Sequence, residues 1–480
     1  MSIVDWDATE LSRAIHGRQV SCEEVMQAYL VQIQRFNPSV NALVSLRDSD
    51  AVLAEARACD RELDQGKSRG WMHGMPQAIK DLAATRGLRT TLGSALFAEH
   101  VPSEDAISVA RVRASGAIII GKTNVPEFGL GSHTYNTLFG TTGNAYDPRL
   151  AAGGSSGGAA VALALRMLPV ADGSDMMGSL RNPAAFNNVF GLRPSQGRVP
   201  HGPMPELFVQ QLGTEGPMGR SVTDVARLLG IQAGYDPRVP LSSRDDPAVL
   251  GQPLRRDFNG ARLGWLGDYN GYLPMQDGVM SLCEAALGDF ATLGCDVQRC
   301  QPDFSLARLW RCWLVHRHWL VHGNLGAAYA NPQKRALLKP EAQWEVQGGQ
   351  GLSAQQVYQA SMDRSEWYRA LAALFERYDF LLLPTAQVFP FDAQQAWPRH
   401  VAGREMDTYH RWMEVVIGPT LAGLPSMSIP VGFNPEGLPM GLQIIGPAQA
   451  DRAVLQLAYA HEQLTQWVQR RPPACLEAIA

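Results

Sequence analysis

Two serines stand side by side in residues 151–160, a stretch that reads AAGGSSGGAA and holds no other reactive side chain. A serine hydroxyl becomes a useful nucleophile only when a neighbouring base takes its proton. Histidine commonly serves as that base, and lysine is a known alternative. Ser155 and Ser156 are therefore candidates for acyl transfer, provided that the fold brings such a base to them.

Lysine is scarce in this chain, so each lysine is worth weighing as that base. Five lysines stand among 42 basic residues, and the others are arginines. Arginine keeps its proton across the ordinary pH range, so it cannot accept one from serine. A buried lysine can, because burial lowers its pKa by up to about 3–5 units. Lys80 follows the apolar run PQAI and Lys122 follows AIIIG, so both are candidate bases.

The elements that must position these residues alternate between strand and helix over 70–235. Short apolar runs predict buried strands that end near Lys80, cover the isoleucines at 118–120, and follow Leu168 in LPVADGSD. Residues 157–168 are small and apolar, which is typical of a buried helix. This alternation predicts an α/β core with a largely parallel or mixed sheet.

The rest of the chain continues this pattern around a helical middle. Positions 1–60 look helical, and Ser21 with Glu24 fits a capping box. Positions 236–375 are expected to be mainly helical, and strand character returns at 380–391 and 424–433, before an amphipathic helix in DRAVLQLAYAHEQL. We predict one domain over 1–480, whose core covers about 60–235 and 376–465.

Composition and charge exclude several classes of function. The net charge is −4 without a basic stripe, which disfavours nucleic acid as a partner. No window approaches about 18 uninterrupted apolar residues, which disfavours a membrane span. The start of the chain is acidic and lacks the apolar segment of a signal peptide. Seven scattered cysteines without a CxxC pair are typical of reduced thiols, so a cytoplasmic protein is expected.

Two short motif matches fail on their local context. GAIIIGKT at 116–123 fits a phosphate-binding loop, but three consecutive isoleucines belong in a strand, and Pro126 disfavours the helix that should follow. The stretch around Ser155 and Ser156 fits G-x-S-x-G, but NAYDPRLAA before it is not the strand that a nucleophile elbow requires. Nucleotide binding and an elbow hydrolase are therefore disfavoured.

A longer match covers GGSSGGAAVALALRMLPVADGSDMMGSLRNPAAFNNVFGLRPSQGRVP at 153–200. This block resembles the defining pattern of the amidase signature family, in which GGSSGG precedes a small-residue helix, G-[TS]-D-x-x-G-S-x-R-x-P-A and G-[LF]-[KR]-P. The resemblance extends to GMPQAIKD, SGAIIIGKTNVPEFG, YDFLLLPTA and AGLPSMSIPVGF, and it is thin between about 236 and 375, a region that is variable and substrate-facing in the family. It implies the amidase signature fold, an α/β fold with a single large mixed sheet covered by helices on both faces.

Carried over position by position, the resemblance implies a Ser–cis-Ser–Lys triad. Ser179 in DMMGS matches the nucleophile, Ser155 matches a relay serine on a cis peptide bond, and Lys80 matches the base. The spacings along the chain agree with the family, both from Lys80 to Ser155 and from Ser155 to Ser179. Ser155 would then pass a proton between Lys80 and Ser179, and Lys122 is the rival base.

The loop before the nucleophile is expected to stabilise the developing oxyanion through its backbone. The N–H groups that the resemblance implies for this hole are those of Met176, Met177, Gly178 and Ser179. Met177 stands where glycine is usual, and it would be strained if that position required a positive φ. Three residues are expected to support the loops of the site: Ser156, Asp175 and Arg181.

Substrate contacts are expected from two segments. Gly129 and Leu130 match a family segment whose backbone contacts substrate, with plain loop geometry as the alternative. In LWRCWLVHRHWLVHGN at 309–324, side chains recur near helical spacing at Trp313, His316, Trp319 and His322. These tryptophans either pack an amphipathic helix on the core or line the substrate pocket.

The resemblance implies an amidohydrolase that cleaves a non-peptide C–N bond of a small apolar or aryl amide through a serine acyl-enzyme. A carbamate or ester hydrolase is an alternative, because the acyl chemistry is shared. A glutaminase subunit of a tRNA-dependent amidotransferase is another, although its usual D-T-G-G-S run is D-M-M-G-S here. No metal or organic cofactor is implied. The expected partner is a small-molecule amide or carbamate, and a homodimer is one candidate assembly.

Overall fold

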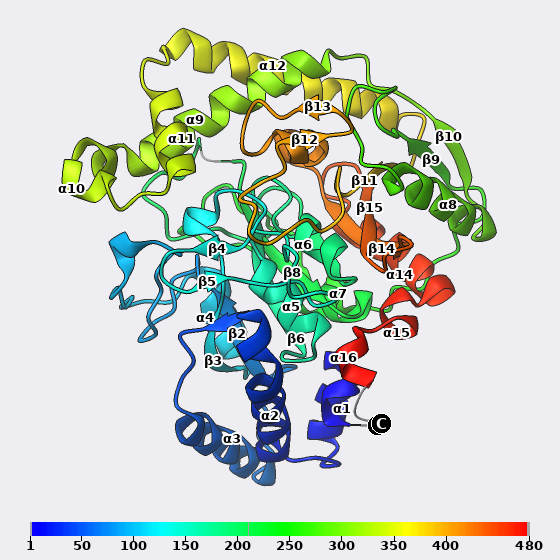
Figure 1. Cartoon of the computed structure of the whole chain (residues 1–480). Coiled ribbons are helices and arrows are strands. Elements are labelled where there is room, and N and C mark those ends of the chain that lie inside the picture. The colour runs from blue at the N-terminus through cyan, green and yellow to red at the C-terminus, as the bar shows by residue number, and fades with distance from the viewer. Residues whose placement is uncertain (1, 210, 478–480) are drawn as a thin grey trace.

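An eight-stranded mixed sheet runs through the molecule in the order β10-β9-β11-β15-β14-β7-β8-β6 (Figure 1). The computed structural model describes residues 2–209 and 211–477. β9 pairs in parallel with β10 and β11, and the other neighbours pair antiparallel. The strands are β6 (Val170–Asp175), β7 (Phe190–Arg193), β8 (Thr214–Gly219), β9 (Arg262–Trp265), β10 (Asp296–Arg299), β11 (Phe380–Pro384), β14 (Ser426–Phe433) and β15 (Pro439–Ile445).

Helices cover both faces of this sheet. Gly216 and Gly219 lie three positions apart on β8, so they face opposite sides. A Cβ on Gly216 would approach Leu180, which precedes α6, and a Cβ on Gly219 would approach Val225 of α7. The expected mixed α/β fold with two helical layers is thus confirmed. The helices that make most of the contacts with the sheet are α5 (Gly157–Ala164), α6 (Arg181–Phe186), α7 (Val222–Gln232), α8 (Val279–Thr292) and α14 (Asp451–Thr465).

A second, three-stranded sheet in the order β1-β3-β2 was not anticipated as a separate unit. It comprises β1 (Leu43–Val44), β2 (Pro76–Lys80) and β3 (Ile118–Thr123), and β3 buries the three isoleucines. The link to the large sheet runs through a side chain: the Lys80 N–H and the Gln77 Nε2 each donate to the Asp172 carboxylate on β6 at 3.2 Å. Lys80 thereby sits at the seam between the two sheets.

Helices pack around this small sheet, and those of the first 65 residues lie in the lower part of Figure 1. The predicted capping box is present, because the Ser21 and Glu24 side chains each accept from the other's backbone N–H at the start of α2. The helices here are α1 (Ala8–His16), α2 (Cys22–Val40), α3 (Ser49–Asp64) and α4 (Ile107–Ala114). Every residue of α5 is buried, as its composition of small apolar residues predicts.

Residues 236–375 are mainly helical, but they also contain β9 and β10. Both strands are short, and DVQR of β10 lacks the apolar run that would predict a strand. The long helices α9, α11 and α12 pack together at the top of Figure 1. This part of the chain comprises α9 (Leu306–Ala330), α10 (Pro332–Arg335), α11 (Pro340–Gly349) and α12 (Ala354–Phe375).

The remaining elements are short. Two-stranded ribbons join β4 (Tyr135–Asn136) to β5 (Gly140–Thr141) and β12 (His400–Val401) to β13 (Arg404–Glu405). The short helices are α13 (Ile417–Ala422), α15 (Trp467–Arg470) and α16 (Ala474–Glu477). Among the described residues, none of the helices combines the length and apolar character that crossing a membrane requires.

Candidate active site

Lys80, the last residue of β2, lies buried against the serine loop. Its Nζ lies 2.9 Å from Ser155 Oγ and 2.7 Å from Ser156 Oγ. It also contacts Ser174, donating to the carbonyl oxygen at 3.0 Å and lying 3.0 Å from the hydroxyl. Of these partners, only the Ser174 carbonyl oxygen must accept a hydrogen bond, because a hydroxyl can either donate or accept one. The contacts therefore suit a neutral amine as well as an ammonium.

Burial decides the protonation of this lysine. Removal from water lowers the pKa of Lys80 to about 7, although the carboxylates of Asp175 and Asp172 act in the opposite direction. Lys122 is also buried, and burial lowers its pKa to about 8. Its Nζ, however, donates to Ala83 O at 2.7 Å and to Thr85 Oγ1 at 2.8 Å. Of the two candidate bases, the structure brings Lys80 to the serines and places Lys122 elsewhere.

The serine loop is held by close backbone approaches. The Gly154–Ser155 peptide bond is cis, as the resemblance implies. The Ser156 N–H donates to Ser179 O at 3.2 Å, which ties this loop to the loop of the third serine. A Cβ on Gly158 would lie 2.4 Å from Asn124 N, so only glycine lets the chain pack this closely against the backbone of Asn124. Ser156 bonds to Lys80 and joins the two loops.

A buried ion-pair cluster supports the loop before Ser179. Arg181 donates to both Asp175 oxygens, Nε at 2.9 Å and Nη2 at 3.0 Å, and both side chains are fully buried. Arg193 lies 3.5 Å from the same carboxylate. Burial would raise the pKa of Asp175, but these two guanidinium groups hold it well below its usual range. Asp175 and Arg181, which were both expected to support the loops of the site, thus pair directly with each other.

The Asp175 carboxylate accepts a hydrogen bond from one of the four backbone N–H groups expected in the oxyanion hole. Gly178 N–H donates to Asp175 Oδ1 at 2.8 Å, so it is already engaged. Within residues 2–209 and 211–477, the N–H groups of Met176, Met177 and Ser179 have no hydrogen-bond partner. Of the four N–H groups expected in the oxyanion hole, three are thus without a hydrogen bond, and the Asp175 carboxylate anchors the loop through the fourth.

Met177 is accommodated without backbone strain. The positive φ in this loop falls on Gly178, at 77°, and not on Met177. A Cβ on Gly178 would lie 2.8 Å from both Asn182 Nδ2 and Val416 Cγ2, so glycine is required there for space as well as conformation. The Met177 side chain is buried in the core.

These groups open onto a cavity of about 370 Å³, which we call the serine pocket. Ser155, Ser174 and Ser179 line it, together with Gly129 and Leu130 from the segment expected to contact substrate. A Cβ on Gly129 would lie 3.2 Å from Ser155 Oγ, so this glycine keeps the hydroxyl accessible. The apolar part of the lining is Leu82, Leu92, Phe97, Phe128, Leu130, Met176, Met177, Met204, Val321, Leu325 and Met413.

The two tryptophans singled out on α9 do not line this pocket. Trp313 is fully buried in the core, and Trp319 packs against the same core. The helix instead presents Arg317 and Val321 to the pocket, one and two turns beyond Trp313. Sequence reasoning missed Arg317 because arginine is common in this chain and nothing local marks it.

His201 and Ser174 were also missed. Ser174 stands in the matched G-[TS]-D block, which was a signal that its hydroxyl belongs to the site. His201 lines the pocket with Nδ1 3.4 Å from Glu215 Oε1. Burial would lower the pKa of His201, but the Glu215 carboxylate raises it. No local motif surrounds this histidine, so no sequence signal could have found it.

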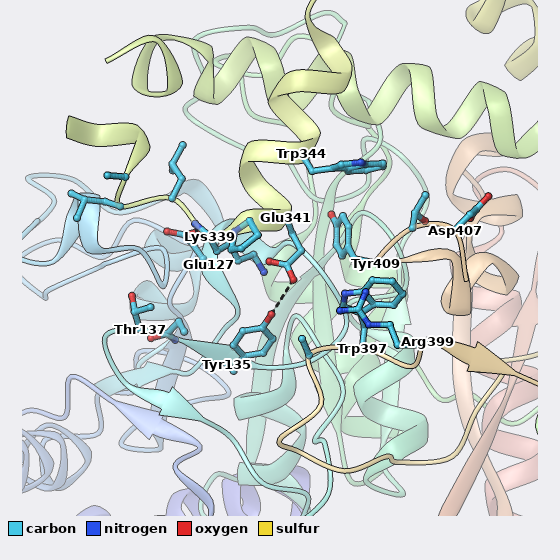
Figure 2. Close-up of a pocket in the computed structure, with 17 residues that line it drawn as sticks. Glu127, Tyr135, Thr137, Lys339, Glu341, Trp344, Trp397, Arg399, Asp407 and Tyr409 are labelled. Atoms are coloured by element: carbon cyan, nitrogen blue, oxygen red, sulfur yellow. Dashed lines mark hydrogen bonds between the residues drawn. The ribbon is translucent and has the colours of Figure 1, made fainter. Parts of the chain in front are cut away.

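Figure 2 shows a larger cavity of about 690 Å³, which we call the aromatic cavity. Its lining carries four aromatic side chains, namely Tyr135, Trp344, Trp397 and Tyr409. Tyr135 donates to Glu341 Oε1 at 3.2 Å, the contact dashed in Figure 2. Lys339 Nζ donates to Leu130 O at 2.6 Å, and Leu130 also lines the serine pocket. The two cavities therefore share a wall.

The fold and the site together define a class of protein: mixed α/β, with a buried lysine bonded to paired serines beside an apolar pocket that holds a third serine. The family model described as Amidase matches residues 24–455. The chain belongs to the amidase signature family, and it is a hydrolase of that family.

Known relatives span nearly the whole chain. The A subunit of glutamyl-tRNA(Gln) amidotransferase from Thermosynechococcus vestitus is 35% identical, over 96% of this chain and 98% of that one. Among solved structures, a bacterial aryl acylamidase of the amidase signature family superposes with a TM-score of 0.89 at 29% identity, covering 96% and 97% of the two chains. The corresponding amidotransferase chain from Thermotoga maritima superposes with a TM-score of 0.74 at 25% identity, covering 96% and 95%.

Proposed function

We propose that this chain is an amidase that hydrolyses the carboxamide bond of small apolar or aryl amides, with Ser179 as the nucleophile. The observation that carries the proposal is the contact of Lys80 Nζ with Ser155 Oγ, 2.9 Å apart, in the pocket that Ser179 also lines. A buried lysine with a pKa of about 7 is a base that can work near neutral pH.

The proposed reaction moves one proton in each half. Neutral Lys80 accepts a proton from Ser155 as Ser155 takes the proton of Ser179, whose oxygen attacks the carbonyl carbon. The proton returns through Ser155 to the leaving nitrogen, the C–N bond breaks, and an ester remains on Ser179. Water then attacks this ester, loses its proton along the same path, and releases the carboxylic acid.

The negative charge on the carbonyl oxygen would be held by the unpartnered N–H groups of Met176, Met177 and Ser179. Donors that are already oriented need no rearrangement when the charge develops, and one such donor is worth about 3–4 kcal/mol. The bond from Gly178 N–H to Asp175 fixes this loop, and the pair with Arg181 fixes Asp175. Asp175 and Arg181 act in this proposal by positioning the loop.

The lining of the serine pocket supports an apolar substrate. Phe97 and Phe128 form an edge-to-face pair with centroids 6.2 Å apart, and leucine and valine side chains complete this part of the wall. Burying such surface against an apolar group contributes about 25 cal/mol per Å². Carbamates and esters pass through the same tetrahedral chemistry, so they remain alternative substrates of the proposed site.

A glutaminase function is the second candidate, because the Thermosynechococcus amidotransferase chain is 35% identical along nearly its whole length. Two observations weigh against it. The superposition on the aryl acylamidase is better than on the Thermotoga chain, with TM-scores of 0.89 and 0.74. The nucleophile block reads DMMGS, which puts the Met176 and Met177 side chains where the usual amidotransferase run has smaller residues.

A substrate panel tests the proposal. The purified chain alone should hydrolyse acetanilide and 4-phenylbutanamide with kcat/KM at least about tenfold above that for glutamine, because the pocket wall is apolar. Ammonia or aniline release is the measurement, and matched carbamates and esters are the comparison arms. A preference for glutamine, or activity that appears only with a partner protein, would instead favour the amidotransferase assignment.

Activity should rise with pH through neutrality. Lys80 must lose its proton to act as a base, and its pKa is lowered to about 7. The active fraction is therefore small below this value and complete above it, so kcat/KM should increase about tenfold from pH 6 to pH 8 and then level off. Initial rates in buffers of constant ionic strength measure this profile. An activity maximum near pH 5 would contradict a lysine base.

A further inference from the structure

One guanidinium faces the serine pocket, that of Arg317 in the middle of α9. Its side chain is almost fully buried and is fixed from two sides. Nε donates to Glu345 Oε1 at 2.5 Å, and Nη2 donates to Tyr409 OH at 2.7 Å. Tyr409 in turn donates to the same Glu345 oxygen at 2.6 Å, from the wall that faces the aromatic cavity in Figure 2. This triangle prevents the guanidinium plane from turning.

The third nitrogen of Arg317 lacks a strong acceptor. Nη1 carries two hydrogens, and its contact in the described part of the chain is Met176 Sδ at 3.7 Å. A thioether is a weak acceptor, so the donor capacity of this edge is poorly used. Because Met176 begins the loop that leads to Ser179, Nη1 lies beside the place where a substrate would react.

Several apolar side chains share the pocket with this donor. Phe97, Phe128, Val321 and Leu325 line the same pocket. A ligand in an apolar pocket takes its orientation from the few polar groups that the wall offers. A fixed N–H next to the reacting centre would discriminate between substrates that carry an acceptor at that position and substrates that do not.

The charge around Arg317 indicates which acceptor fits. Glu345 is fully buried and already pairs with the guanidinium, and its other oxygen lies 2.9 Å from His318 Nδ1. Burial would raise the pKa of Glu345, but Arg317 holds it well below its usual range, so the pair is ionised and balanced. A substrate carboxylate would add a buried charge without a partner, which is costly. A neutral oxygen would not.

We propose that Arg317 is a specificity-determining residue that binds a neutral oxygen of the substrate, outside the scissile amide, through Nη1. The substrate class is then an apolar or aryl amide that carries a carbonyl oxygen on one of its two arms. This inference rests on the proposed amidase function. The inference adds to that function a chemical group that the substrate must carry.

Matched substrates test this. 4-Oxo-4-phenylbutanamide and 4-phenylbutanamide differ by a carbonyl in place of a methylene on the acyl side, and N-phenacylacetamide and N-(2-phenylethyl)acetamide differ in the same way on the amine side. In at least one pair, the ketone should have a kcat/KM about tenfold or more above its partner, because a site built to donate discriminates against a missing acceptor. Succinamate supplies the carboxylate arm.

In Arg317→Gln the preferred pair should lose its discrimination, with the ratio of kcat/KM values falling toward one and the change lying mainly in KM. Tyr409→Phe is a second variant, because it frees Nη2 while leaving the pair with Glu345 in place, and the ratio should fall partly. Arg308→Gln is the matched control: Arg308 is on the same helix and pairs with Asp363 and Glu366 away from the pocket, so the ratio should not move.

The outcomes separate the two proposals. If a fluorophosphonate labels Ser179 and amides are hydrolysed, but neither pair shows discrimination or folded Arg317→Gln and Tyr409→Phe keep it, the role of Arg317 is wrong and the amidase function stands. Preference for succinamate over both ketones would overturn the neutral acceptor. Absence of labelling and of all amide hydrolysis in the wild type would contradict the amidase function and the inference together.

Discussion

Replacing Ser179 with alanine is expected to abolish amide hydrolysis and to remove the site of covalent labelling. Without the hydroxyl no acyl-enzyme can form. Removing the nucleophile typically lowers the kcat of an enzyme of this kind by about 10⁴–10⁶-fold. The wild-type chain should react with a fluorophosphonate, and mass spectrometry of peptides should place the adduct on Ser179. The substitution removes one oxygen in a buried loop, so folding should be preserved.

The neighbouring serines are the controls for this prediction. Ser155→Ala should also lose activity, because it removes the relay that touches Lys80 Nζ at 2.9 Å. The adduct in the wild type should nevertheless be absent from Ser155 and Ser156. An adduct on either of them, in a Ser179→Ala variant that still reacts, would show that the opening pair of serines holds the nucleophile.

Lys80→Met is expected to reduce kcat by about 10³-fold or more, since it removes the general base while keeping the length of the side chain. The residue is buried, and its pKa of about 7 suits it to take a proton from serine near neutral pH. The rate of fluorophosphonate labelling at Ser179 should fall in parallel, because the same base activates the same hydroxyl. The rise of the remaining activity around pH 7 should disappear.

Lys122→Met is the matched control for the base. Lys122 is equally buried and has a pKa lowered to about 8, but its ammonium bonds to Ala83 O and Thr85 Oγ1 and to no serine of the site. At a matched folded fraction, measured by thermal unfolding, its kcat should stay within a few-fold of wild type. A loss equal to that of Lys80→Met in a folded protein would mean that the base had been misassigned.

Much of the fold could be predicted because the pattern is local. The isoleucines of β3, the small residues of α5 and the capping box of α2 each follow from a few neighbouring residues. The strand β10 could not be found, because DVQR pairs with β9 at the edge of the sheet and has no apolar run of its own. The place of β2 and β3 in a second sheet could not be read from local sequence either, because the contact that joins this sheet to the large one is made by Asp172, from a distant part of the chain.

The candidate site, like the fold, could be predicted from the sequence only in part. The dense block of glycine, serine, aspartate and arginine at 153–200 was enough to nominate Ser155, Ser179, Asp175 and Arg181. The three free N–H groups could not be counted from this block, because the Asp175 carboxylate occupies that of Gly178. Arg317 enters the pocket from a helix that lies far beyond the block in the sequence, and the two tryptophans of that helix face the core instead.

The sequence by itself determined which hydroxyl, amine and carboxylate groups this protein possesses, how they are spaced, and the family to which the chain belongs. The resemblance pointed to Lys80 as the base, but only the tertiary structure shows that this lysine meets the serines, that burial lowers its pKa to about 7, and which side chains form the pocket wall. The physical reason is that a pKa and the shape of a pocket depend on burial and on contacts between distant segments. The spacing of residues along the chain reveals neither the pKa nor the shape of the pocket.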